Sequence, residues 1–391
     1  MRQRRNRRTG RFAWLLGIAA ALIIPAACTP APVPSSPRIV DMAAGGQTCA
    51  FFSDGLVKCW GANSTASHFD GTTTMGSVGD GTTTDRHTPV DVVDLSGVDS
   101  VSAQWGTACA TTTADEVYCW GPNEYGQIGD GTLVDRPSPV RVLGLSSVSK
   151  VDVGGRHTCA IVAEGRVKCW GQNTWGTLGD GTYNDSVTPV DVSGVVGATD
   201  IAAGGWHTCV LVEGGAVDCW GHGWFYGASF TENSTPYRVP GISGATAISA
   251  GDGHVCVLAD NQVRCWGWNR FGQIGDGTLT NPHPQIHTIT EIRDPVRVAA
   301  GPAHTCALEA AGTVKCWGHN LYGEVGDGTF VQRLSPTEVI GITEATDLVV
   351  GYDTSCALEL GGMKCWGGNA EGQLGDGTTT DSALPVDVIG L

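Results

Sequence analysis

The sequence repeats one cysteine-containing unit seven times between residues 39 and 391. Each unit holds a Cys-Trp-Gly motif and a second cysteine shortly before it. The motif cysteines are Cys59, Cys119, Cys169, Cys219, Cys265, Cys316 and Cys365, and the earlier ones are Cys49, Cys109, Cys159, Cys209, Cys256, Cys306 and Cys356. Successive earlier cysteines lie 60, 50, 50, 47, 50 and 50 residues apart, and an insertion at residues 64–75 lengthens the first interval. This regularity predicts one large repeat domain rather than several unrelated ones.

Each unit is a series of short strands and turns. Stretches such as residues 201–212 and 216–221 alternate or run apolar over strand lengths, and a loop ending in Gly-Asp-Gly-Thr leads to a further strand such as residues 188–192. The fourth unit lacks Gly-Asp-Gly-Thr and has residues 222–230 instead. No segment shows a sustained helical period. The pattern predicts an all-β fold, a seven-bladed β-propeller with one intra-hairpin disulfide per blade.

The spacing of the cysteines predicts how they pair. Nine residues separate the pair in five units and eight in the other two. A hairpin centred between the cysteines then has a turn of three residues, such as 53–55, or of two, such as 260–261, and places the cysteines opposite each other within disulfide reach. The third turn position is Gly in four of five cases, which suits a left-handed conformation. Zinc binding is the competing interpretation, but its usual spacing of two to four residues is not met.

The N-terminus resembles an export signal. Residues 1–27 hold six Arg, no acid and an apolar stretch from Phe12 to Ala27. Small residues before Cys28 resemble a lipoprotein cleavage site, which predicts lipidation of Cys28, although Pro25 departs from that motif. Ordinary signal cleavage nearby is the alternative. Residues 28–38 are a Pro/Ser-rich tether, and residues 39–391 form the propeller. We expect the protein at the cell-envelope surface, with a lipid on Cys28 as its only membrane contact, or in the extracellular space.

The net charge of the chain limits the classes of molecule that it can bind. Loss of residues 1–27 and their six Arg lowers the formal net charge from −16 to −22. Such an acidic chain is repelled by phosphate backbones, so we expect no nucleic-acid partner. We expect a monomer without cofactors that binds a protein or a glycan.

Three repeated polar or aromatic positions are interpreted as structural. The Asp of Gly-Asp-Gly-Thr could bind calcium but is better explained as a turn residue. The histidines before the first cysteine are His157, His207, His254 and His304, and the other units have Gln47, Thr107 and Thr354 there, which favours a hydrogen-bonding role over metal binding. The Trp after each second cysteine is expected to pack between blades. No catalytic or metal motif is found, so we expect neither an enzyme nor a metal site.

Departures from the repeat are the better candidates for binding. One is the first-unit insertion, with His68 and Phe69, and the other is the fourth-unit loop, with Trp224, Phe225, Tyr226 and Phe230. A second aromatic set, Tyr125, Trp175, Phe225, Phe271 and Tyr322, is interpreted as core, although exposure on one face would make it an anchor for a partner.

The repeats resemble those of the regulator of chromosome condensation family, as residues 201–221 and 265–278 illustrate. The resemblance covers residues 39–391 and implies a seven-bladed propeller. Residues 39–40 and 385–388 could then complete one blade and close the ring, which we state as a hypothesis. The nuclear role of the founding member does not suit an acidic, exported chain. We expect a non-enzymatic cell-surface binding protein; the alternative is a secreted inhibitor of an extracellular enzyme, similar to a propeller-type β-lactamase inhibitory protein.

Overall fold

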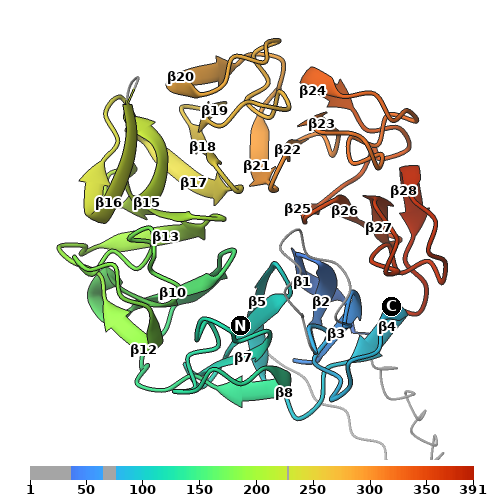
Figure 1. The fold of residues 1–391 in the computed structure, drawn as a ribbon. Helices are drawn as coiled ribbons and strands as arrows, with labels where there is room; N and C mark the ends of the chain where they lie inside the picture. Colours follow the sequence, from blue (N-terminus) through green and yellow to red (C-terminus); the bar gives the residue numbers. More distant parts are fainter. Residues whose placement is uncertain (1–36, 65–75, 227–228) are drawn as a thin grey trace, which may run out of the picture. The chain divides into compact units, whose positions relative to one another are not determined.

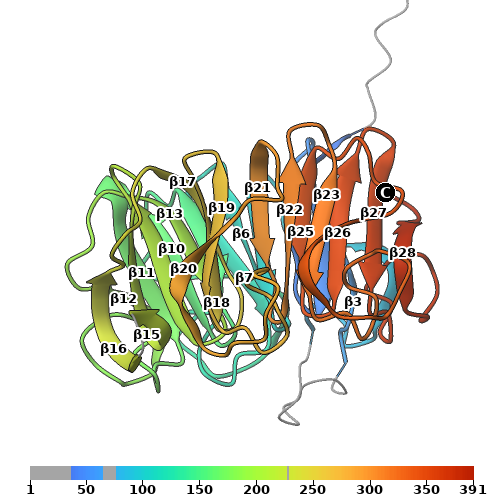
Figure 2. The same ribbon diagram turned by 90° about the horizontal axis from the view of Figure 1, so that it is seen from above.

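The computed structural model describes residues 37–64, 76–226 and 229–391, and these form one compact unit from Pro37 onward. Seven four-stranded antiparallel sheets are arranged around a central channel, as Figure 1 shows along the channel and Figure 2 from the side. The fold is therefore the seven-bladed propeller predicted from the repeats. None of the helices in the described part of the chain is long and apolar enough to span a membrane.

Every blade is built from four strands that follow one another in the chain. The innermost strands are β1 (Ile39–Ala44), β5 (Val98–Gln104), β9 (Lys150–Val153), β13 (Ala198–Ala203), β17 (Ala245–Ala250), β21 (Pro295–Ala300) and β25 (Asp347–Val350). The second strands are β2 (Gln47–Phe52), β6 (Thr107–Thr112), β10 (His157–Val162), β14 (His207–Val212), β18 (His254–Ala259), β22 (His304–Glu309) and β26 (Thr354–Glu359).

The third strands carry the Cys-Trp-Gly motifs, and the fourth strands form the outer edge. The third strands are β3 (Val57–Gly61), β7 (Val117–Gly121), β11 (Arg166–Gly171), β15 (Ala216–Tyr226), β19 (Gln262–Gly267), β23 (Val314–Gly318) and β27 (Gly362–Gly367). The outer strands are β4 (Arg86–Asp91), β8 (Arg136–Arg141), β12 (Ser186–Asp191), β16 (Ser229–Arg238), β20 (His283–Ile289), β24 (Arg333–Glu338) and β28 (Ser382–Asp387). A short 3-10 helix, η1 (Ala163–Gly165), forms one hairpin turn.

The hydrophobic core lies between neighbouring blades. The second strand of each blade is buried along most or all of its length because adjacent blades cover both faces of the sheet. One representative cluster joins Val263 and Leu258 of the fifth blade to Val298 and Trp317 of the sixth. Side-chain packing of this kind, repeated around the ring, holds the blades together.

The seven disulfides are confirmed within the hairpins. Each pair of cysteines lies directly opposite across the second and third strands, with Cα atoms 4.1 or 4.2 Å apart. The turn lengths are also as predicted, with Val162 opposite Arg166 around a three-residue turn and Ala259 opposite Gln262 around a two-residue turn. In all five three-residue turns the third residue has a positive φ, and this includes Asp115, which takes the place of Gly.

The ring does not close by pairing of the chain ends, so that hypothesis is wrong. The first blade is complete within β1–β4 and the seventh within β25–β28. Closure depends instead on packing and hydrogen bonds between complete blades (Figure 1). In particular, Thr48 Oγ1 and Trp60 Nε1 both donate to the carbonyl oxygen of Gln373 at 3.0 Å.

Candidate functional site at the mouth of the channel

The turns between the innermost and second strands surround one end of the channel. Five of these turns have three residues, the second blade has Trp105 and Gly106 after Gln104 at the end of β5, and the first blade has only Gly45 and Gly46. We call them together the turn ring: residues 45–46, 104–106, 154–156, 204–206, 251–253, 301–303 and 351–353. Neighbouring turns are joined through their backbones, for example from Gly155 N to Gly204 O at 3.1 Å and from Tyr352 N to Gly45 O at 3.2 Å. The ring therefore holds its side chains on a fixed frame.

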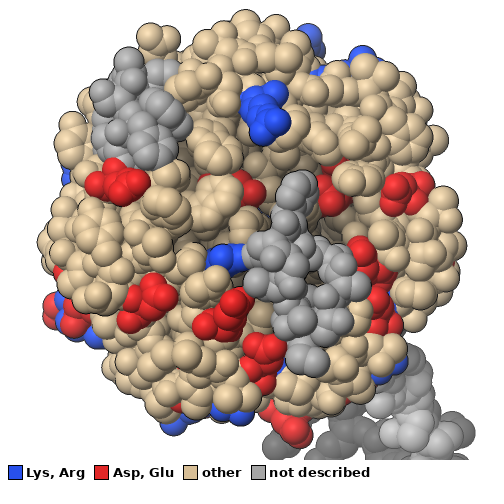
Figure 3. Space-filling model, viewed as in Figure 1, with Lys and Arg blue, Asp and Glu red and all other residues tan. Residues whose placement is uncertain are grey.

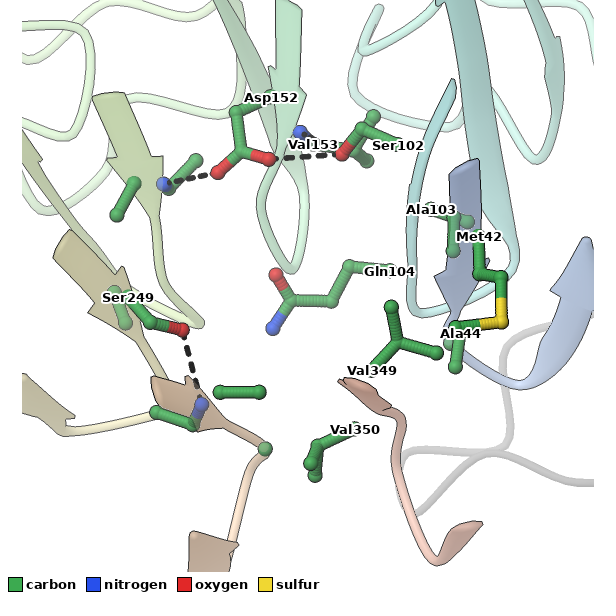
Figure 4. Close-up of a pocket in the computed structure, with 18 of the residues that line it drawn as sticks. Met42, Ala44, Ser102, Ala103, Gln104, Asp152, Val153, Ser249, Val349 and Val350 are labelled. Carbon is green, nitrogen blue, oxygen red and sulfur yellow. Dashed lines mark hydrogen bonds between the residues drawn. The ribbon is translucent and has the colours of Figure 1, made fainter. Parts of the chain in front are cut away.

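The residue at the first position of each turn decides whether a side chain can extend into the channel there. It is Gly in five blades, and a Cβ at Gly154 would lie 2.5 Å from Cε1 of His157. The second blade has Thr107 in place of this His and Gln104 in place of the Gly. The Gln104 side chain extends into the channel (Figure 4). With its amide turned so that the nitrogen faces the two acceptors, this nitrogen donates to Val153 O at 2.8 Å and Ala203 O at 3.0 Å.

Trp105, the next residue, has an unusual backbone. Its φ of +46° lies in the left-handed region, which is unfavourable for a bulky side chain. Such strain costs on the order of 1–3 kcal/mol and is concentrated at functional sites in proteins. The conformation directs the indole toward side chains from three other blades.

Five further side chains surround Trp105 and define, with it, what we call the aromatic mouth: Tyr125, Arg156, Trp206, Trp268 and Tyr352. The rings of Trp105 and Trp206 meet edge to face with centroids 5.9 Å apart, and Trp206 and Trp268 lie 5.3 Å apart. Trp105 and Tyr352 are 6.4 Å apart. All six side chains are partly exposed. Figure 3 shows one face of the propeller, where acidic and basic groups are scattered among a majority of uncharged residues.

Arg156 contributes a cation to this cluster. Its guanidinium lies 4.8 Å from the ring centroid of Tyr125 and 5.9 Å from that of Trp105. Its Nη1 also donates to the Tyr125 hydroxyl at 2.9 Å. An arginine held over aromatic faces is pre-organised, so less side-chain entropy is lost when it binds.

Two acidic residues of the turn ring are also unusual. Burial raises the pKa of Asp252 to about 7, against a hydrogen bond from the Trp105 side chain that favours the charged form. Burial and the nearby Glu324 carboxylate raise the pKa of Asp353 to about 7. Both carboxyl groups can therefore change protonation near neutral pH.

The channel beneath the mouth encloses a cavity of about 550 Å³ lined by all seven innermost strands. Four of its charged side chains form ion pairs, with Lys150 bound to Asp200 and Arg297 to Asp347. Asp152 accepts hydrogen bonds from Ser102 Oγ at 2.9 Å and from Ala203 N at 2.7 Å (Figure 4), while burial raises its pKa to about 6. These partners come from neighbouring blades, so the lining joins the blades together.

The repeated Asp is a turn residue, as predicted. Asp130 Oδ1 accepts from the backbone N and the Oγ1 of Thr132, and its Oδ2 binds Arg136. Asn123 completes the loop by donating to Thr132 O and Val134 O. Because donors of the chain itself bind both carboxylate oxygens, the repeated Asp is explained by its role in the turn, and no calcium ion is needed.

Three of the four repeated histidines bond to a neighbouring blade, which confirms the predicted hydrogen-bonding role for them. Nε2 of His157, His254 and His304 lies 2.8 Å from a hydroxyl oxygen of the following blade. In the first case that hydroxyl, on Thr208, donates its proton to Thr177 O, so His157 must supply the proton from Nε2. Burial lowers the pKa of His157 to about 4 and that of His254 to about 3, which keeps both rings neutral.

The repeated tryptophans are fully buried and join the blades, also as predicted. Six of the seven indoles donate to a loop carbonyl of the preceding blade, at 2.8–3.1 Å. The exception is Trp266, whose Nε1 has no hydrogen-bond partner among the described residues. It follows the fourth blade, where β15 and β16 form a long hairpin in place of the Gly-Asp-Gly-Thr loop.

The other predicted sites have mixed outcomes. Cys28, His68 and Phe69 lie outside the described residues. Trp224, Phe225 and Tyr226 belong to β15 and Phe230 to β16, but their side chains are outside the described part. The core interpretation of the second aromatic set is wrong for Tyr125, Trp175, Phe271 and Tyr322, which are partly exposed or exposed at the same end as the turn ring.

Of the aromatic mouth, only Tyr125 was a candidate from the sequence, and the other five residues were not predicted. They lie next to strongly repeated positions, and a repeat pattern identifies the residues that all blades share, not those that differ between blades. The available signal was the turn between the first two strands of each unit, which differs in every blade while its flanks stay regular. Variable side chains on a fixed frame are typical of binding surfaces.

Comparisons with known proteins agree with this architecture. The family model described as regulator of chromosome condensation (RCC1) repeat matches residues 114–161, 164–211 and 260–308, and a second model of this repeat matches residues 148–176, 198–227, 245–273 and 296–324. The chain belongs to the regulator of chromosome condensation repeat family.

Among curated proteins, the chain is similar to the ultraviolet-B receptor UVR8 of Arabidopsis thaliana, with 34% identity over 79 residues, or 20% of this chain and 18% of that protein. It therefore spans less than a fifth of that relative. Among solved structures, it is similar to Prp20p of Saccharomyces cerevisiae, with a TM-score of 0.75, 21% identity and coverage of 86% and 87% of the two chains. Human WBSCR16 has a TM-score of 0.70, 22% identity and coverage of 83% and 88%.

At these identities the structural likeness shows the fold. Propellers of this kind commonly mediate protein binding, and the family consists mostly of non-enzymatic binding or exchange-factor proteins. Prp20p itself has been described with its binding properties to Gsp1p and histones.

Proposed function

We propose that this protein is a non-enzymatic binding protein that holds a partner protein against the aromatic mouth. The observation that carries the proposal is the cluster of Trp105, Trp206, Trp268, Tyr352 and Arg156 at the channel entrance. Trp, Tyr and Arg dominate the binding energy of protein interfaces, particularly when they cluster at the centre of a patch. The strained backbone of Trp105 supports a role beyond folding.

A protein partner fits this geometry better than a glycan. A sugar stacks on the open face of an aromatic ring, whereas the edge of one indole faces the other in the Trp105–Trp206 pair, at an interplanar angle of 89°. The face of Trp105 also lies near the Arg156 guanidinium. Edges and clefts between rings suit the irregular side chains of a protein surface.

The protein acts, in this proposal, outside the cytoplasm. Seven disulfides within the described residues favour an oxidising compartment, and residues 1–27 have the pattern of an export signal. A lipid on Cys28 would hold the propeller at the envelope surface. The departure at Pro25 favours the second candidate, a soluble secreted inhibitor of an extracellular enzyme. Mass spectrometry of the mature N-terminus distinguishes the two, because only the first requires an acylated Cys28.

The test of binding is a quantitative affinity capture from the envelope and culture fluid of the producing cells. The purified protein is compared with a variant carrying Trp105→Ala and Trp206→Ala. A matched control carries Leu143→Ala and Val196→Ala, two exposed apolar residues in loops at the opposite end of the blades.

We expect a protein partner that the control retains and the Trp variant loses. Retention of every captured protein by the Trp variant would refute the proposal. Capture of a polysaccharide alone, lost with the same two substitutions, would reassign the mouth to glycan binding.

A further inference from the structure

A cluster of three potential metal ligands lies where the sixth and seventh blades meet. His319 and Glu324 belong to the loop that follows β23, and Asp353 belongs to the turn ring of the seventh blade. One ligand atom from each residue lies within 4.8 Å of the other two. Among the described residues, this is the one group of three or more His, Cys, Asp or Glu side chains with such geometry.

Glu324 provides the first argument that the cluster has a role beyond stabilising the loop. The equivalent residues of three other blades are Gln127, Gln273 and Gln373, and in each case Oε1 accepts from the backbone N two residues earlier. Glu324 makes the same bond, from Tyr322 N at 2.9 Å. Since a neutral Gln satisfies the loop elsewhere, the fully buried negative charge of Glu324 needs another explanation.

The remaining oxygen of Glu324 faces His319, whose Nδ1 lies 2.5 Å away. The imidazole is itself fixed between the rings of Phe271, at 4.9 Å, and Tyr322, at 6.1 Å. A nitrogen and an oxygen held this close share a proton in the absence of a metal, and a divalent cation can replace that proton.

Asp353 provides the second argument. Its carboxylate is partly buried beside the pair, yet it accepts no hydrogen bond from any described residue. Room for it comes from Gly368, where a Cβ would lie 3.0 Å from the Cβ of Asp353. A partly enclosed carboxylate without a donor, next to a histidine and a second carboxylate, is the arrangement that a bound cation would satisfy.

We propose that His319, Glu324 and Asp353 form a site for a divalent transition-metal cation, with Zn²⁺ as its probe. One imidazole nitrogen and two carboxylate oxygens suit zinc and its neighbours in the transition series. Calcium is a poor match, because it prefers six to eight oxygen ligands. The remaining coordination positions are open to water on the face that carries the aromatic mouth. This inference does not depend on the proposed function, because all three ligands belong to this chain and no binding partner is needed to form the site.

The site occurs at one blade junction. The residue equivalent to His319 is a histidine in one other blade, as His222, and there its Nδ1 lies 3.8 Å from Glu232. The residue equivalent to Asp353 in that next blade is Gly253. His222 therefore provides a matched control, with the same residue type at the same position but, among the described residues, no cluster of three potential ligands.

The test is isothermal titration of the purified, metal-free protein with Zn²⁺, and separately with Ca²⁺, in a non-chelating buffer. We expect one Zn²⁺ per chain, reversal by a chelator, and weak or no Ca²⁺ binding. Each of the variants E324Q and D353N should weaken Zn²⁺ binding by at least about 100-fold, since loss of even an outer-shell partner costs 10–100-fold. H222A should leave it unchanged.

Both ligand variants are expected to fold, because Gln already occupies the position of Glu324 in three other blades and Asp353 makes no side-chain hydrogen bond within the described chain. A thermal denaturation of each variant checks this. Absence of stoichiometric Zn²⁺ binding to the wild-type protein, or equal Zn²⁺ affinity in wild type, E324Q and D353N, would overturn the proposal. Calcium binding tighter than zinc binding would overturn the choice of cation class.

Discussion

The blade junctions repeat the same residue types around the propeller, whereas the turn ring has different residues in each blade. At the junction of the fifth and sixth blades, Gln273 O accepts from Thr305 Oγ1 and Trp317 Nε1, both at 2.9 Å, and His254 Nε2 lies 2.8 Å from the same hydroxyl. A hydroxyl side chain and the indole make the same two bonds to one carbonyl oxygen at four of the six other junctions. The turn ring, only a few residues away, carries a different set of side chains in each blade. Repetition therefore identifies the positions that hold the ring, and variation identifies the surface available for binding.

The junction of the fourth and fifth blades shows what happens when the repeat is interrupted. The loop that would supply the carbonyl is replaced by the β15–β16 hairpin, and Val255 takes the place of the hydroxyl residue. Trp266 Nε1 then has no partner in the described part of the chain. The apolar contacts remain, because Trp266 is still fully buried among Val217, Val239 and Val257. Hydrophobic packing thus maintains a junction from which the shared hydrogen bonds are missing.

Acid should have the largest effect on the junctions. Burial lowers the folded-state pKa of His304 to about 4, against about 6.5 in an unfolded chain. Its contribution to stability is therefore complete above pH 6.5 and is lost as the pH falls from 6.5 through 4. Replacing His304 by Thr, the residue found there in the second and seventh blades, should reduce the stability lost between pH 7 and pH 4 by about 3 kcal/mol.

The measurement is urea denaturation of both proteins at several pH values. Asp152 acts with the opposite sign, because its raised pKa of about 6 makes its contribution largest at low pH and smaller as the pH rises through 6. Since Asp152 is present in both proteins, the difference between them isolates the histidine. Parallel pH profiles would show that His304 is not held neutral at the junction.

A single hydroxyl should matter next. Thr305→Val leaves the buried His254 N–H without its acceptor, and we expect a loss of about 2 kcal/mol in the free energy of unfolding. Thr305→Ser is the matched control, because Ser355 already makes the same bond with His304 at the following junction. Urea denaturation in which the Val and Ser variants behave alike would contradict the role given to the hydroxyl.

The regular and interrupted junctions can be compared directly through their tryptophans. Phe replaces the buried indole with a similar loss of volume at both sites, but only Trp317 loses a hydrogen bond. Trp317→Phe should therefore be more destabilising than Trp266→Phe by about 1 kcal/mol. An equal or reversed cost, measured by urea denaturation, would mean that the hydrogen bonds add little to the apolar packing.

The smallest effect on stability is expected in the turn ring. Trp105→Gly relieves the backbone strain at a φ of +46° but removes the contacts of the indole. These effects oppose each other, so the free energy of unfolding should stay within about 1 kcal/mol of wild type. A loss several times larger would make Trp105 a structural residue and weaken its assignment to binding.

The sequence alone predicts much of this fold because the fold is periodic. The cysteine spacing gave the hairpins and their turn lengths, and the substitution of His by Gln or Thr at one position correctly indicated a hydrogen-bonding role. The repeats could not show how the ring closes, because the strand patterns at both chain ends are compatible with a shared blade. Nor could they show the aromatic mouth. Trp105, Arg156, Trp206 and Tyr352 lie about 50 residues or more apart, and only the circular arrangement brings them together.

The most direct test of the division between junction and mouth is the dissociation constant of the captured partner for three proteins: wild type, Trp206→Ala and Thr305→Val. We predict that Trp206→Ala weakens binding by roughly 30-fold or more, as expected for a central interface tryptophan, with an unchanged thermal midpoint. Thr305→Val should lower the thermal midpoint and leave the dissociation constant unchanged. Wild-type affinity in Trp206→Ala, or equal losses of affinity in both variants, would contradict the assignment of binding to the aromatic mouth.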